Sequence, residues 1–198
     1  MSGFVSLARQ LHPSVEAAFV LAREWCAGHE IDGGPALGHA VKVTNLIGHH
    51  APQAPTHVLA ACLLHDAPDL APDQEEMASR ITDRCGVEVL DLINHLHAEH
   101  EVLNRPTGQN TAAHLETLVR VPWLLHTATA DKVVAMEYVT GRAAADPDAD
   151  AFWVARPAFV RLIPYFLRVH QVGLGVIPRS LSDAYGQALA RCPAPRVD

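Results

Sequence analysis

The sequence predicts an all-α protein that folds as one domain. Apolar residues recur at helical spacing through most of the 198 residues, and no alternating run longer than a few residues indicates a strand. Glycine and proline divide the chain into segments of helical length. A hydrophobic content of 49% can fill the core of a single domain of this size.

Five helices are predicted in the first half of the chain. Pro13 and a Ser14 cap begin the first helix, and Gly28 follows its end. The acidic run 73–76 is typical of a helix N-terminus, where carboxylates interact favourably with the helix dipole. The predicted helices span residues 13–27, 39–49, 56–66, 73–85 and 87–97.

The second half is predicted to begin with a loop at 100–110. Thr111 caps the next helix and Ser182 caps the last. The predicted helices span residues 111–121, 124–142, 152–170 with a break near Pro164, and 182–191, and an acidic loop occupies 146–150. We expect the core to comprise about residues 13–171, with helix 182–191 appended and the tail 193–198 frayed.

Composition excludes several classes of partner. The formal charge of −7, with only two lysines, argues against binding to a nucleic-acid polymer. No apolar run approaches the roughly 20 residues of a membrane span, and the N-terminus does not resemble a signal peptide. Four scattered cysteines fit free thiols in a reducing cytoplasm. The sequence leaves the oligomeric state open.

A histidine and an aspartate, His65 and Asp66, stand side by side at the end of the apolar run 58–64. Buried polar groups are costly unless a partner satisfies them. The pair therefore indicates a partner, and a metal ion is one candidate. The alternative is a pair of polar residues satisfied within the core.

With His39 upstream and Asp131 downstream, this doublet resembles the metal-ligand set of the HD phosphohydrolases. The resemblance implies that His39, His65, Asp66 and Asp131 bind one divalent ion. Two imidazoles and two carboxylates suit Mn²⁺, the preferred candidate, and also Fe²⁺, Co²⁺, Zn²⁺ or Mg²⁺. A water beside such an ion would become a nucleophile, and phosphate oxygens could bind next to it.

Four segments resemble one branch of this superfamily, the alarmone hydrolases of the RelA/SpoT type. Residues 33–40 resemble their Gly-x-Pro-Tyr-x-x-His-Pro segment, and residues 60–66 resemble Ala-Ala-Leu-Leu-His-Asp. Residues 85–93 and 130–133 resemble Phe-Gly-x-x-Val-x-x-Leu-Val and Ala-Asp-Lys-Leu. The resemblance implies an HD-type helical bundle and hydrolysis of a small phosphorylated substrate, such as a nucleotide.

The substrate positions depart from that branch. Glu30 and Ile31 replace its Arg-Lys pair, and Asp69 and Leu70 replace its Glu-Asp pair. Asp69 is the candidate general acid or water-orienting base beside Asp66, and its alternative role is a solvated helix-end carboxylate. An altered phosphate or pyrophosphate ester is therefore the expected substrate. A metal- and ligand-binding regulatory module without catalysis is the alternative.

The basic residues that could bind phosphate are few: Lys132, Arg105, Arg142 and Arg23. Lys132 adjoins Asp131 but points about 100° away from it on a helix, so pairing with an acidic neighbour is the favoured interpretation. The tract His95, His97 and His100 superficially resembles a second metal site. His95 and His97 face opposite sides of a helix and only His97 and His100 share one, so a second metal site is the less favoured interpretation.

Overall fold

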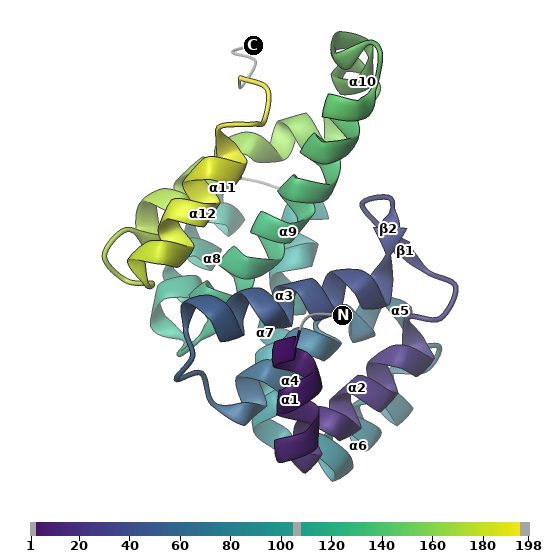
Figure 1. The fold of residues 1–198 in the computed structure, drawn as a ribbon. Helices are drawn as coiled ribbons and strands as arrows, with labels where there is room; N and C mark the ends of the chain where they lie inside the picture. The colour runs from purple at the N-terminus through teal and green to yellow at the C-terminus, as the bar shows by residue number, and fades with distance from the viewer. Residues whose placement is uncertain (1–2, 105–107, 195–198) are drawn as a thin grey trace.

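Helices form almost all of the regular structure, which confirms the predicted all-α class (Figure 1). The computed structural model describes residues 3–104 and 108–194. Its helices are α1 (Gly3–Leu11), α2 (Pro13–Trp25), α3 (Ala36–His50), α4 (Thr56–Leu64), α5 (Ala67–Leu70), α6 (Gln74–Cys85), α7 (Val87–Asn104), α8 (Gly108–Arg120), α9 (Leu124–Ala145), α10 (Ala149–Val154), α11 (Pro157–Gly173) and α12 (Arg179–Leu189). Within these described ranges, no helix combines the length and apolarity needed to cross a membrane.

Helix α4 lies at the centre of the N-terminal half. All its residues from 58 to 64 are buried, as a helix that is apolar on every face requires. It packs against α2, α3 and α7. Helix α9 packs on α3, α7, α8 and α12, so α3 and α7 connect the two halves of the molecule (Figure 1). Helix α1 adds to the predicted elements and packs against α2 and α3.

A short antiparallel hairpin precedes α3 and was not predicted. Strand β1 (Glu30–Ile31) pairs with β2 (Gly34–Pro35). Asp32 and Gly33 join the strands with φ of 53° and 82°, the left-handed backbone that a two-residue Asp-Gly turn favours. A Cβ at Gly33 would collide with the guanidinium of Arg142 from α9. Both the positive φ and the lack of space therefore favour glycine at this position. The hairpin is thereby fixed against α9.

Helix α7 is longer than predicted. The loop predicted at 100–110 is wrong for residues 100–104, which continue α7, and for 108–110, which begin α8. The apolar pattern ends at about Leu96, but the helix continues because a polar residue is buried in the core beyond that point. The Glu99 side chain is fully buried and pairs with Lys132 of α9 at 2.7 Å. Local periodicity in the sequence cannot reveal a partner 33 positions away in the chain.

The C-terminal elements also differ in their boundaries. The acidic loop 146–150 includes the start of α10, where Asp148 accepts a hydrogen bond from the Ala151 amide at 2.9 Å. The break in the predicted helix 152–170 occurs before Pro157, and Pro164 lies inside α11. Ser182 does not cap α12, which begins at Arg179. Instead Ser182 is buried, with Oγ 3.4 Å from Nε2 of His170.

Candidate metal centre

The four proposed ligands come from three regions of the chain that meet at one end of α4. His39 lies in the first turn of α3, and His65 is the residue at which α4 ends. Asp66 follows directly and precedes α5, and Asp131 lies within α9. Both histidine side chains are 1% exposed, so the surrounding helices hold them in place.

Three donor atoms converge at this point. Nε2 of His39 lies 3.2 Å from Nε2 of His65 and 2.9 Å from Oδ1 of Asp131, and the third separation, from His65 to Asp131, is 3.4 Å. Metal–donor bonds of about 2.1 Å place neighbouring donors roughly 3 to 3.4 Å apart. The observed separations therefore match the spacing of donors around one ion, and these atoms form a group that could hold a metal.

A hydrogen bond determines which ring nitrogen of His65 carries a proton and which is free to bind a metal ion. Its Nδ1 lies 2.8 Å from the carbonyl oxygen of Cys62, which can only accept, so Nδ1 carries the proton. In the neutral ring, Nε2 then presents its lone pair to His39 and Asp131. A carbonyl partner that fixes the donor nitrogen in this way is usual for metal-binding histidines.

Asp66 lies beside these three donor atoms, next to His65. Its Oδ2 lies 3.1 Å from Nε2 of His65. The same oxygen is buried and, while His65 is neutral, has no hydrogen-bond donor among the described residues. An orphaned buried carboxylate oxygen costs free energy unless a cation compensates it. The four residues therefore fit a divalent ion, which their two imidazoles and two carboxylates would coordinate.

The charged groups around these donor atoms favour a bound cation, either a proton or a metal ion. Burial of Asp131 is unfavourable for its carboxylate, but the nearby imidazoles of His100, His39 and His65 outweigh that effect and hold its pKa well below the usual range. Burial likewise opposes charge on His65, yet the carboxylates of Asp66 and Asp131 raise its pKa to about 9. Protons and a metal ion thus compete for the same donors.

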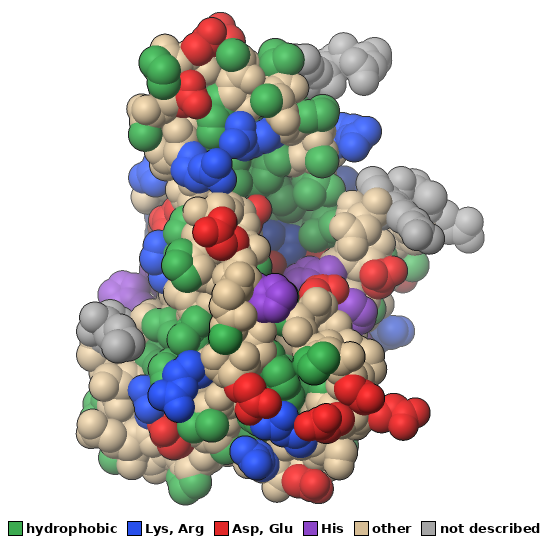
Figure 2. All heavy atoms as spheres, turned by 90° about the vertical axis from the view of Figure 1, so that its right-hand side faces the viewer, with side chains coloured by type: hydrophobic (Ala, Val, Ile, Leu, Met, Phe, Trp, Pro, Cys, Tyr) green, Lys and Arg blue, Asp and Glu red, His purple; other side chains and the backbone are tan. Residues whose placement is uncertain are grey.

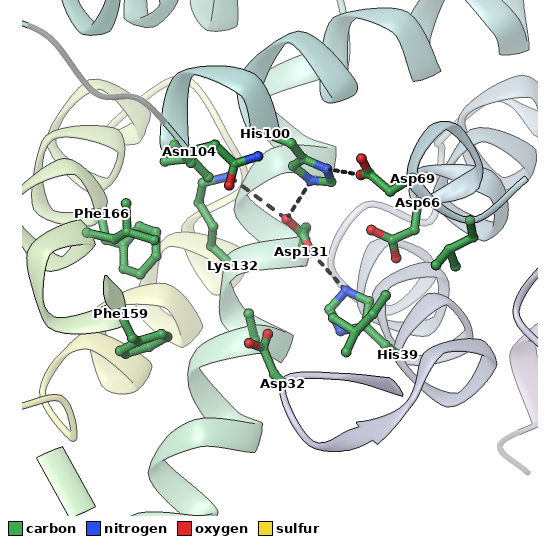
Figure 3. A pocket seen from close by; sticks show the side chains of 15 residues that line it. Asp32, His39, Asp66, Asp69, His100, Asn104, Asp131, Lys132, Phe159 and Phe166 are labelled. Carbon is green, nitrogen blue, oxygen red and sulfur yellow. Dashed lines mark hydrogen bonds and ion pairs between the residues drawn. The ribbon is translucent and has the colours of Figure 1, made fainter. Parts of the chain in front are cut away.

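A second pair of polar residues lies beside this centre. Asp69 of α5 places Oδ2 3.2 Å from Nδ1 of His100 on α7, and Nε2 of His100 lies 3.9 Å from Oδ2 of Asp131 (Figure 3). The hydrogen bond to His100 lowers the pKa of Asp69. Burial opposes charge on His100, but Asp131 and Asp69 raise its pKa to about 10. The raised pKa of His100 and the lowered pKa of Asp69 favour a protonated imidazole paired with a carboxylate.

His100 was missed as a functional residue because it was expected in a loop. Only its position three residues after His97, on one helical face, could have indicated it. Nδ1 of His97 lies 3.7 Å from Oδ1 of Asp69, too long for a hydrogen bond, and is buried without a partner among the described residues. Asp69, His97 and His100 offer donor atoms within 4.8 Å of one another, a second group that could hold a metal.

A cavity of about 420 Å³ lies beside these groups and is shown from close by in Figure 3; His65 and His97 are not part of its lining. Phe159 and Phe166 lie at one end, and His39, Asp66 and Asp69 lie at the other. The polar lining comprises Asp32, His39, Asp66, Asp69, His100, Asn104, Asp131 and Lys132. The apolar lining comprises Ile31, Leu70, Leu103, Ala135, Phe159, Leu162 and Phe166. Burial raises the pKa of Asp32 to about 6, while His39 opposes that rise.

The candidate phosphate-binding residues lie in different places. Lys132 lines the cavity but is 2% exposed and paired with Glu99. Arg142 donates from Nη1 to the backbone oxygen of Asp32 at 3.3 Å, outside the lining of this cavity. Arg23 is exposed on α2 and does not line it either. Arg105 lies outside the described residues.

Comparison with protein families identifies one match. A family model described as HD domain matches residues 18–142. The matched segment contains His39, the His65–Asp66 doublet and Asp131, together with Asp69 and His100, and it ends before α11. Comparison with curated proteins gives no match.

Proposed function

The chain belongs to the HD domain family, and on that premise we propose that it is a divalent-metal-dependent phosphohydrolase. HD domains are generally metal-dependent hydrolases. The observation that carries the proposal is the convergence of His39, His65 and Asp131 within 3.4 Å, with the lone pair of His65 Nε2 directed at the other two. Asp66 is proposed as the fourth ligand, and Mn²⁺ is the preferred ion.

Each part of the site has a role in phosphate-ester hydrolysis. A divalent ion, when bound, supplies a Lewis acid that activates water and neutralises phosphate oxygens. The carboxylate of Asp69 accepts a hydrogen bond from Nδ1–H of His100 and so fixes the orientation of that ring. His100 then holds a second proton on Nε2, 3.9 Å from Oδ2 of Asp131 in the cavity lining. From there it can protonate the oxygen of the leaving group.

We further propose that the substrate differs from that of the alarmone hydrolases. Ile31, which stands where those enzymes carry a basic residue, lines the cavity with an apolar side chain. Glu30 beside it is exposed. Among the described residues, Lys132 is the only lysine or arginine that lines the cavity, and it is already paired with Glu99. The same shortage of positive charge supports the alternative of a non-catalytic module that retains the metal.

Metal analysis and a substrate panel separate these possibilities. Purified protein should contain Mn²⁺ or a related ion, and Asp66→Ala should lose it, whereas Asp91→Ala, an exposed site on α7, should retain it. The wild-type protein should hydrolyse members of a panel of nucleotides and phosphate esters faster than His65→Ala. Bound metal without turnover would favour the module, and equal metal in Asp66→Ala would refute the ligand assignment.

A further inference from the structure

We infer that the apolar end of the cavity binds the organic group of a phosphate monoester, and that this group is compact, apolar and uncharged, such as an aryl group. The inference rests on the proposed function, because it places the phosphate at the metal-binding end. It names the class of substrate that the proposed function leaves open.

The apolar end is built mainly by one helix. Phe159, Leu162 and Phe166 of α11 form a wall at positions three or four residues apart, one face of the helix. The rings of Phe159 and Phe166 pack edge to face with centroids 5.8 Å apart. Leu103 of α7 and Ala135 of α9 extend the surface. A planar apolar group would contact aromatic and aliphatic carbon on several sides.

This wall faces the proposed metal centre. Figure 3 shows the two phenyl rings on one side of Lys132 and the side chains of Asp66 and His39 on the other. Figure 2 shows the same side of the molecule hollowed, with hydrophobic side chains beside a row of histidines. The cavity of about 420 Å³ falls in the range typical of small-molecule sites. One monoester can therefore occupy both ends at once.

The two ends differ in their relation to the family. The HD domain match ends at residue 142, so the proposed metal ligands lie inside it and α11 lies outside it. Catalytic residues and the apolar wall thus belong to separate parts of the chain. This division fits a family chemistry combined with a substrate-binding element particular to this protein.

Charge also favours a substrate with few negative charges. Four carboxylates line the cavity: Asp32, Asp66, Asp69 and Asp131. Among the described residues, its only lysine is Lys132, which is paired with Glu99, and no arginine lines it. A second phosphate placed away from the metal would meet carboxylates without a free lysine or arginine to offset their charge. A monoester instead places its whole negative charge at the ion. Its organic group then gains free energy by leaving water.

Steady-state kinetics with Mn²⁺ test the inference. We expect kcat/KM to be at least about 10-fold higher for benzyl phosphate than for methyl phosphate or guanosine tetraphosphate. Phe159→Ala should lower kcat/KM for benzyl phosphate about 10- to 100-fold, mainly through KM, and should affect methyl phosphate far less. Leu162→Ala is the second variant if the first does not fold. Leu167→Ala, exposed on the same helix, should leave both rates unchanged.

Calorimetry gives a readout that does not require turnover. The Mn²⁺-loaded protein should bind benzylphosphonate about 10-fold or more tightly than methylphosphonate, and Phe159→Ala should abolish the difference. Equal affinity for the two phosphonates, or faster hydrolysis of guanosine tetraphosphate than of benzyl phosphate, would overturn the inference. If the phosphonate preference is present but no ester is hydrolysed, the apolar site stands and the proposed catalysis fails.

Discussion

Asp69 and His100, 31 positions apart in the chain, form a hydrogen bond of 3.2 Å that joins α5 to α7 beside the proposed metal ligands. Asp69 carries a carboxylate that fixes Nδ1 of the ring, and the other nitrogen of His100 lies 3.9 Å from Oδ2 of Asp131. From the sequence, Asp69 was the candidate general acid or water-orienting base, with a solvated helix-end carboxylate as the alternative. In the function that we propose, the imidazole of His100 holds the proton and Asp69 orients the ring.

The first prediction concerns this pair. His100→Gln should lower kcat by about 10²- to 10⁴-fold on alkyl phosphates, because their poor leaving groups need a proton. The loss should be much smaller on p-nitrophenyl phosphate, whose leaving group departs as a stable anion. Asp69→Asn should give a weaker form of the same pattern. His95→Gln on the same helix is the control, and an equal loss on both substrates would argue against proton donation.

The second prediction concerns the number of metal ions. We expect about one equivalent of Mn²⁺ per chain by elemental analysis after dialysis, lost in His39→Ala and retained in His97→Ala. The group Asp69, His97 and His100 offers the contrasting result. Two equivalents in the wild-type protein, reduced to one in His97→Ala, would show a second ion and would remove His100 as a free proton donor.

The sequence predicted much of the fold and part of the site because those features are local or occur as adjacent residues. The helical periodicity identified the all-α class, and the His65–Asp66 doublet at the end of an apolar helix indicated a polar site. The structure brings His39 and Asp131 to that doublet. The role of these residues as ligands remains a prediction that metal analysis tests.

The remaining features depend on contacts between distant segments. Glu99 and Lys132 satisfy each other across two helices, and neither residue type predicts burial by itself. The apolar wall of α11 reads in sequence as an ordinary amphipathic face, because spacing cannot distinguish a core surface from a cavity surface. Phe159 becomes a candidate substrate contact only because α11 packs along the cavity that three of the proposed metal ligands also line.

The third prediction tests the buried pair. Glu99→Leu should destabilise the fold by about 3–5 kcal/mol, because it leaves the ammonium of Lys132 buried without its partner. The double variant Glu99→Leu with Lys132→Met should recover part of that loss. Urea denaturation measures each free energy of unfolding, with Glu101→Leu, an exposed position on the same helix, as the control. A Glu99→Leu variant as stable as the control would show that the pair contributes nothing.

The fourth prediction concerns the hairpin beside the cavity. Gly33→Ala should destabilise the protein by about 1–3 kcal/mol, because alanine disfavours a φ of 82° and its Cβ meets Arg142. Adding Arg142→Ala should relieve the collision and restore only part of the stability. Gly3→Ala, with open space around the position, is the control. Thermal unfolding measures all four proteins, and complete recovery would mean that the backbone contributes no strain.

The last prediction concerns guanosine tetraphosphate. Two charge-assisted contacts of roughly 1.5–3 kcal/mol each would be absent at Glu30 and Ile31, which weakens binding by about two to four orders of magnitude. The wild-type protein should therefore hydrolyse this nucleotide poorly. Glu30→Arg combined with Ile31→Lys should raise kcat/KM by at least about 10-fold, since Ile31 lines the cavity.

The control is Glu116→Arg, which adds positive charge at an exposed site on α8. A gain shared by this control would reflect general attraction of the nucleotide and not a restored contact. Efficient, selective release of pyrophosphate by the wild-type protein would contradict the prediction. That result would require another cation to reach the cavity, and Arg23→Ala and Arg142→Ala would then identify whether either residue supplies it.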